Sequence, residues 1–260
     1  MQIAKNQPQA PSVAPAGFDE DYAEWKSWDS ASFGRYSHLD AAYYRAEFGI
    51  GEAAGKRVLE IGFGNGSALG WLKDRGAEVH GLEANPILVA RALQLLGADR
   101  AFEDLADSRL SSMSGTFDCI IALDVLEHVP MDALTGMLSR IRELLAPGGR
   151  AFFRFPNGDS PFGRINQNGD PTHITVLGGA RLTWFARRAG LEVLSLRAPA
   201  LPVRGVGLLR GFRRLLIRNA RRMIEPAIGQ LYFYGRRIPL DPNYIAVLGR
   251  PAAVAGAALH

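Results

Sequence analysis

Residues 58–66, Val-Leu-Glu-Ile-Gly-Phe-Gly-Asn-Gly, constrain the fold of this chain more than any other stretch. A short apolar run bounded by glycines is typical of a buried strand, and glycines at alternate positions let the backbone pass close to a ligand. We predict a strand at residues 57–61, a ligand-binding turn, and a helix at residues 67–75. The alternative is a strand-turn-helix junction that binds nothing.

The spacing of the glycines narrows the choice of ligand. A dinucleotide fingerprint reads G-x-G-x-x-G and receives a pyrophosphate at a helix N-terminus. Here Gly62, Gly64 and Gly66 form G-x-G-x-G, and Ser67 replaces the third fingerprint glycine. Glu60 would repel a phosphate but can hold an ammonium group. The stretch resembles motif I of the class I S-adenosylmethionine-dependent methyltransferases, which implies that the glycines lie under the amino acid part of that cofactor.

An acidic residue follows the next predicted strand, at residues 78–82. In open α/β sheets an acid about 20 residues beyond the glycine loop reaches the ribose hydroxyls. Glu83 has this position, with Ala84 beside it, and its carboxylate can accept a hydrogen bond from both hydroxyls. The alternative is an exposed cap for a helix at residues 86–96. His80, in the middle of the strand, is expected to pack in the core.

A weak third strand is predicted at residues 101–105. Methyltransferases of this class often place an acid there to accept from the adenine amino group. The resemblance implies that Asp104 and the backbone of Leu105 do so, and Glu103 and Asp107 are competing candidates.

A second block supports the same resemblance. Residues 117–129, Phe-Asp-Cys-Ile-Ile-Ala-Leu-Asp-Val-Leu-Glu-His-Val, resemble the family pattern F-D-x-[IV]-x-x-x-D-V-L-E-H-[VL]. The resemblance implies that Leu123 and Asp124 lie beside the cofactor and that His128 opens the following helix near the substrate cavity. We predict that helix at residues 131–145, stopped by Pro-Gly-Gly at 147–149 ahead of a strand at 150–155.

The order of these elements predicts the fold class. We expect an α/β, Rossmann-like three-layer sandwich with a seven-stranded, mostly parallel sheet, whose last strands lie near residues 191–196 and 244–248. The methyltransferase domain would span residues 51–250, with a helical insertion at 200–240 and an N-terminal helical cap at 18–50. Residues 1–17 and 251–260 are expected to be flexible tails.

Methyl transfer to an alcohol needs a base for the hydroxyl proton, and histidine has the nearest ordinary pKa. His173 is our first candidate as base or acceptor ligand, with Asp170 orienting it, and a loop-bracing role is the alternative. His128 is the second candidate, and Asp124 could orient the acceptor. Where the family often has an aromatic residue and a Ser or Thr, this chain has Leu177 and Gly178, which puts the local helix cap in doubt.

The sequence gives no sign of metal binding, secretion or nucleic acid binding. None of the five histidines forms a close pair with another histidine or a cysteine at ligand spacing, so no metal site is expected. The single cysteine, Cys119, agrees with a reducing compartment. Without a signal peptide or a long apolar stretch, we expect the cytoplasm. The charge of +4 and the missing N-P-P-[YF] tetrad give no reason to expect nucleic acid binding.

Residues 208–224 are predicted to form a basic amphipathic helix, because leucines and arginines recur on opposite faces. Such a helix can lie on the anionic inner face of a membrane or bind an acidic partner. Alternatively, its apolar face packs on the domain or on a second subunit, and the protein is a monomer or a homodimer.

The acceptor is the least constrained part of the prediction. The tail at residues 237–244 resembles tails of methyltransferases in bacterial glycan assembly, which favours a hydroxyl on a sugar or glycan intermediate. The alternatives are O-methylation of a phenolic or polyprenyl-linked small molecule, or a non-catalytic regulatory protein that binds S-adenosylmethionine. The intact Glu60, Glu83, Asp124 and His128 argue against the regulatory protein.

Overall fold

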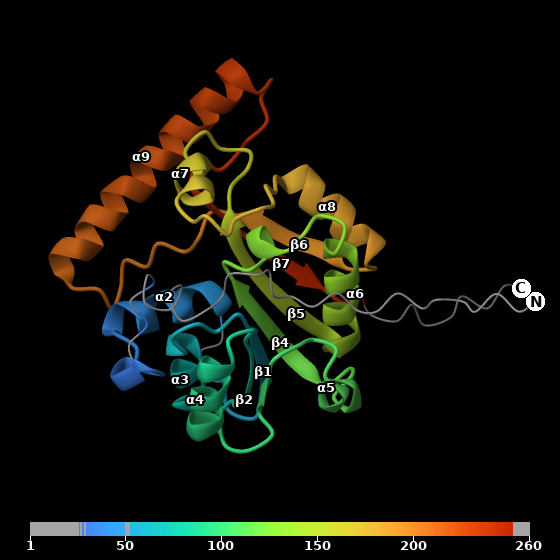
Figure 1. The fold of residues 1–260 in the computed structure, drawn as a ribbon. Coiled ribbons are helices and arrows are strands. Elements are labelled where there is room, and N and C mark those ends of the chain that lie inside the picture. Colours follow the sequence, from blue (N-terminus) through green and yellow to red (C-terminus); the bar gives the residue numbers. More distant parts are fainter. Residues whose placement is uncertain (1–25, 27, 29, 50–52, 252–260) are drawn as a thin grey trace, which may run out of the picture.

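A computed structural model describes residues 26, 28, 30–49 and 53–251. Three parts of the prediction lie outside the described residues: the tail at residues 1–17, the start of the N-terminal cap, and residues 252–260. The described part of the chain forms a seven-stranded sheet in the order β3-β2-β1-β4-β5-β7-β6 (Figure 1). Only β7 runs antiparallel to its neighbours. The predicted fold class is therefore confirmed.

The strands fall close to their predicted positions because short apolar runs with glycine or proline boundaries specify them locally. The third strand is shorter than predicted and has two residues instead of five. The strands are β1 (Arg57–Ile61), β2 (Glu78–Leu82), β3 (Ala101–Phe102), β4 (Phe117–Leu123), β5 (Leu145–Pro156), β6 (Glu192–Arg197) and β7 (Asn243–Gly249).

Helices cover both faces of the sheet (Figure 1). Side chains of β4 alternate between two cores, because Ile120 faces one and Ile121 the other. One core includes residues of α5, α6 and α8, and the other includes residues of α2, α3 and α4. The helices are α2 (His38–Phe48), α3 (Ser67–Lys73), α4 (Pro86–Leu96), α5 (Ser108–Ser112), α6 (Leu134–Leu144), α7 (Gly163–Asn168), α8 (Gly179–Arg188) and α9 (Leu208–Tyr232), with 3-10 turns η1 (Ser30–Ser32) and η2 (Leu126–His128).

The Pro-Gly-Gly element lies inside β5, whereas we predicted it before the strand. The pairing of β4 with β5 explains the difference. Phe117 pairs with Leu145 and Cys119 pairs with Arg150, so the extra residues bulge out of the ladder. Gly148, at a φ of 77°, supplies the left-handed conformation for this bulge. The preceding helix still ends at Leu144, next to the predicted boundary.

Of the predicted N-terminal cap, the described residues contain η1 and α2. The Tyr44 ring of α2 lies 5.8 Å from the Phe48 ring and 5.6 Å from the ring of Trp71 in α3. Tyr44 also shares a 2.6 Å hydrogen bond with Ser67. These contacts hold α2 against the helix that follows the glycine loop.

Helix α9 extends past both helical layers (Figure 1) and is longer than predicted. Its close approach to the protein is through Gly211 and Gly229, which are the buried residues of the helix. Most of its large apolar side chains do not pack on the domain, although Leu215 is partly buried, which corrects that part of the prediction. The large apolar residues exposed on α9 are Leu208, Leu209, Phe212, Leu216, Met223, Ile224, Leu231 and Tyr232. Within the described residues, no helix is both long enough and apolar enough to span a bilayer.

Candidate active site

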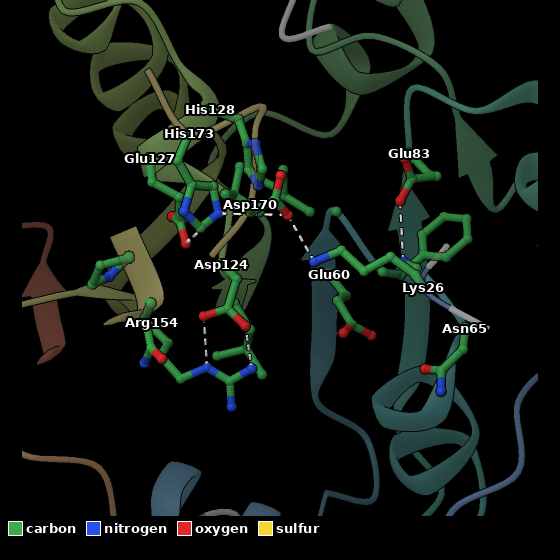
Figure 2. Close-up of a pocket in the computed structure, with 18 of the residues that line it drawn as sticks. Lys26, Glu60, Asn65, Glu83, Asp124, Glu127, His128, Arg154, Asp170 and His173 are labelled. Atoms are coloured by element: carbon green, nitrogen blue, oxygen red, sulfur yellow. Dashed lines mark hydrogen bonds and ion pairs between the residues drawn. The ribbon is translucent and has the colours of Figure 1, made fainter. Parts of the chain in front are cut away.

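A cavity of about 580 Å³ opens at the carboxyl ends of the central strands. Open α/β sheets bind their ligands at this edge. Residues of the glycine loop and Glu83 line one part of the cavity, and Glu127, His128 and His173 line another. Figure 2 shows the polar side chains that converge on this space.

The glycine loop can only be built from glycines. Gly62, Gly64 and Gly66 have φ angles of 68°, 50° and 71°. A Cβ on Gly62 would lie 2.6 Å from Cγ2 of Val125, and one on Gly64 would lie 2.8 Å from Trp28. Gly62 and Gly64 line the cavity, whereas Gly66 caps α3 and faces Phe33. The structure thus brings two of the three predicted glycines to the site.

Glu83 ties the end of β2 to the glycine loop. Its Oε2 accepts from the backbone N–H of Gly64 at 3.0 Å, and its Oε1 accepts from Ala84 at 2.8 Å and Asn85 at 3.3 Å. The predicted alternative of an exposed helix cap is wrong, because Glu83 is buried and Asn85 caps α4. Burial raises the pKa of Glu83, and the backbone hydrogen bond from Gly64 opposes this effect.

Glu60 points into the cavity from β1 beside the glycine loop (Figure 2). The residue is 4% exposed, and its Oε2 has no hydrogen-bond partner among the described residues. Burial and then the charge of Glu83 raise its pKa to about 8. A buried carboxylate oxygen without a donor suits an ammonium group of a ligand, so Glu60, Glu83 and the loop fit the amino acid and ribose parts of S-adenosylmethionine.

The residues predicted for the adenine amino group do not line the cavity. Asp104 accepts from the backbone N–H of Ala106 at 2.8 Å, and Leu105 packs in the core, where its carbonyl accepts from Arg140. Asp107, a competitor, caps α5. The strand that leads to these residues ends at Phe102, three residues before its predicted end.

Leu123 and Asp124, which the resemblance placed beside the cofactor, line the cavity. Asp124 has a φ of 58°, which is uncommon for a residue other than glycine. Arg154 donates from Nε to Oδ1 of Asp124 at 2.8 Å, and its Nη2 contacts Oδ2 (Figure 2). This arginine was missed, although its register opposite Leu123 places it at the same sheet edge.

His128 ends η2, six residues ahead of the start of α6, so it does not open the following helix as predicted. Its Nδ1 lies 2.9 Å from Oγ1 and 3.2 Å from the carbonyl oxygen of Thr172. Burial, followed by the neighbouring His173, lowers the pKa of His128 to about 4. His128 is therefore a neutral imidazole at pH 7.

His173 reaches the same cavity from the loop after α7. The backbone N–H groups of Ile174 and Thr175 both donate to the carbonyl of Glu127 at 2.9 Å, which holds this loop against η2. The ring centroids of His128 and His173 are 4.6 Å apart. His173 Nε2 lies 3.8 Å from Oε1 of Glu127 and 3.8 Å from Oδ2 of Asp170.

Glu127 is the second site residue that the sequence did not single out. It is 1% exposed, and neither carboxylate oxygen has a hydrogen-bond partner among the described residues. Burial, and next the charge of Asp124, raise its pKa well above the ordinary value. Asp170 has a different environment, because Lys26 contacts it at 2.8 Å (Figure 2). Glu127 is thus the acid that most needs a cationic or donating ligand.

Comparison with known proteins agrees with this geometry. Residues 33–196 match the family model described as a methyltransferase domain. The ubiquinone biosynthesis O-methyltransferase of Nitrosococcus oceani is 31% identical over 158 residues, which cover 55% of this chain and 66% of that protein. The enzyme of the same description from Aeromonas salmonicida is 27% identical over 201 residues, which cover 76% of this chain and 77% of that protein. In the first of these, the match spans just under two-thirds of the relative.

Solved structures share the fold. An S-adenosylmethionine-dependent methyltransferase from Archaeoglobus fulgidus has a TM-score of 0.58 at 20% identity, covering 89% of this chain and 100% of that one. The [4+2]-cyclase SpnF has a TM-score of 0.56 at 18% identity, and the match covers 95% of this chain and 98% of that one. These likenesses concern the fold alone. Because the family model matches more than half of the sequence, the chain belongs to the methyltransferase-domain family of class I, S-adenosylmethionine-dependent enzymes.

Proposed function

We propose that this protein transfers the methyl group of S-adenosylmethionine to a hydroxyl oxygen of a phenolic or polyprenyl-linked small molecule. The observation that carries the proposal is the division of one cavity into two ends. Glu60, Glu83 and the glycine loop suit the methyl donor, and the cluster of Glu127, His128 and His173 suits a hydroxyl that must lose its proton.

The relatives favour the phenolic acceptor over the glycan that the sequence led us to expect. The matching enzymes of Nitrosococcus oceani and Aeromonas salmonicida act in ubiquinone biosynthesis and are O-methyltransferases. No relative described here is a glycan methyltransferase, and the resemblance of the tail at residues 237–244 to such enzymes is weaker than the matched domain.

The residues of this chain have mainly positioning roles in such a reaction. Bound S-adenosylmethionine supplies an electrophilic methyl group that an oxygen nucleophile displaces in line. The glycine loop and Glu60 fix the donor end of the cavity. At the other end, His173 receives the hydroxyl proton, and the Glu127 carboxylate, 3.8 Å from His173 Nε2, stabilises the imidazolium that forms. Asp124, fixed by Arg154, borders the path between the two ends.

The exposed face of α9 supports an acceptor that resides in a membrane. Leu208, Phe212, Leu216 and Met223 recur on one side of the helix and are more than half exposed. Arg213 and Arg222 are exposed on either side of this stripe. An apolar stripe flanked by arginines is typical of helices that lie on anionic bilayers. We infer that α9 places the protein at a membrane surface, where a polyprenyl-linked phenol would be found.

The test compares acceptors at equal concentration with labelled methyl donor. A catechol with a short prenyl chain should be methylated on oxygen, and a sugar of similar size should not. His173→Ala should lower turnover by about 100-fold or more while affinity for S-adenosylmethionine stays near normal. His38→Ala is the matched control, because His38 is exposed on α2. Transfer to the sugar alone would refute the acceptor, and binding without any turnover would favour a regulatory protein.

A further inference from the structure

Three side chains at the acceptor end of the cavity have the composition of a metal site. Glu127, His128 and His173 each offer one ligand atom, and these atoms lie within 4.8 Å of one another. They come from two segments 45 residues apart in sequence, which is why no ligand spacing was visible. One carboxylate and two imidazoles form a common set of protein ligands for catalytic zinc.

Hydrogen bonds to the backbone orient both imidazoles for coordination. His173 Nδ1 lies 3.2 Å from the carbonyl oxygen of Gln167, and His128 Nδ1 lies 3.2 Å from that of Thr172. The Thr172 hydroxyl donates to Asp170 at 2.5 Å, so towards His128 this hydroxyl is an acceptor as well. A carbonyl only accepts, so each Nδ1 carries a proton, and an imidazole in this tautomer presents Nε2 as its metal-binding atom. Metal-binding histidines are held in this way.

The distances leave room for an ion between the ligands. His173 Nε2 and Glu127 Oε1 are 3.8 Å apart, which exceeds the length of a hydrogen bond. Two atoms bound to one zinc at about 2.1 Å lie somewhat more than 3 Å apart, so small side-chain movements suffice. An imidazolium of His173 paired with Glu127 is the simpler alternative, but at 3.8 Å the ring makes no hydrogen bond to the carboxylate, and both Glu127 oxygens lack a hydrogen-bond partner among the described residues.

The charges around the cluster also favour a cation there. Asp170 contacts Lys26, and Asp124 contacts Arg154, so both of these acids have cationic partners. Among the three ligands, Glu127 supplies the negative charge, and its buried carboxylate lacks a described donor. A divalent ion would satisfy the carboxylate and both imidazoles at once.

We propose that Glu127, His128 and His173 bind a divalent transition-metal ion of the zinc type, with a coordination position open to the cavity. This departs from the absence of metal expected from sequence. Its consequence rests on the proposed function and replaces the role of His173 as base, because a metal-bound Nε2 cannot accept a proton. A hydroxyl oxygen that coordinates the ion would have a lowered pKa and would lose its proton to solvent at the open side of the cavity before it attacks the methyl carbon.

Metal binding can be measured without donor or acceptor. Tag-free, chelator-treated full-length protein is titrated with Co²⁺, whose visible absorption reports coordination, and with Zn²⁺ by calorimetry. We expect one ion per chain. Glu127→Gln and His173→Ala should each weaken binding by at least ~10-fold. His38→Ala should bind as the unaltered protein does, because this histidine lies on the exposed side of α2.

The proposal is overturned if the unaltered protein shows no visible Co²⁺ bands and no calorimetric binding. It is equally overturned if folded Glu127→Gln, checked by circular dichroism, binds as tightly as the control. Metal binding without methyl transfer would leave the metal site standing and refute the proposed function. Methyl transfer that persists in chelator, with no metal bound, would leave the proposed function standing and refute the role of the ion in lowering the pKa of the hydroxyl.

Discussion

Glu60 gives a sharp prediction, because its carboxylate is buried where a cofactor ammonium should bind. Its pKa of about 8 means that near pH 7 most molecules carry the protonated acid. An ammonium favours the ionised form, so binding must release a proton. We expect the Kd for S-adenosylmethionine to fall about tenfold per pH unit from 6 towards 7.5, or about 1.4 kcal/mol per unit. Near pH 8 the ligand's own amino group begins to titrate, which ends the trend.

The raised pKa of Glu60 also predicts how the stability of the ligand-free protein depends on pH. The folded-state pKa of about 8 lies above the ordinary 4.5, so the folded chain holds this proton more tightly than the unfolded chain. The resulting stabilisation is complete below pH 4.5 and is lost as pH rises to 8. Over this window the loss is on the order of 5 kcal/mol, as an upper bound. Glu60→Gln removes the titration and should stabilise the ligand-free protein at pH 8.

Calorimetry in buffers of different ionisation enthalpy measures both quantities, the Kd and the protons released. Glu60→Gln should bind S-adenosylmethionine more weakly at pH 7.5 and should lose the Glu60-dependent proton release. A Kd that does not change between pH 6 and 7.5, or a Glu60→Gln variant with unchanged affinity, would refute the role of Glu60.

Three further predictions concern the loop, the core and α9. Gly62→Ala should lower the free energy of unfolding in urea by about 1–3 kcal/mol, because its Cβ would lie 2.6 Å from Val125; Gly49→Ala, also at positive φ but with nothing within 4 Å, should lose less, and an equal loss would contradict the steric argument. Cys119 is buried, and burial raises the pKa of its thiol, so a thiol reagent should label it only on unfolding; rapid labelling of folded protein would be inconsistent with this core. Vesicles with anionic lipid should bind the protein at low salt and release it at high salt, and Phe212→Ser should weaken recovery; no binding at low salt would remove the membrane role of α9.

The fold was largely predictable because its signals are local. A short apolar run next to glycines specified β1, and β2 is likewise a short run of buried residues. Asn85 followed by proline specified the start of α4. The glycine loop was predictable for the same reason, since positive φ angles require glycine there. Its position at the sheet edge then follows from the parallel order of the strands.

The acceptor end was harder to predict because it depends on contacts between distant segments. Glu127 and His173 meet only because the loop after α7 hydrogen-bonds to η2. Arg154 reaches Asp124 through the register of β4 with β5. For α9, the pattern showed an apolar face but not whether the domain would cover it. The structure leaves most of that face exposed to solvent.

The most direct test of the account is the fate of a ¹³C-labelled methyl group of S-adenosylmethionine. With purified protein and a prenylated catechol, we predict a new methoxy carbon resonance in the product and one molecule of S-adenosylhomocysteine for each ether formed. Absence of the methoxy product across phenolic acceptors, in protein shown to bind S-adenosylmethionine, would contradict the proposed transfer.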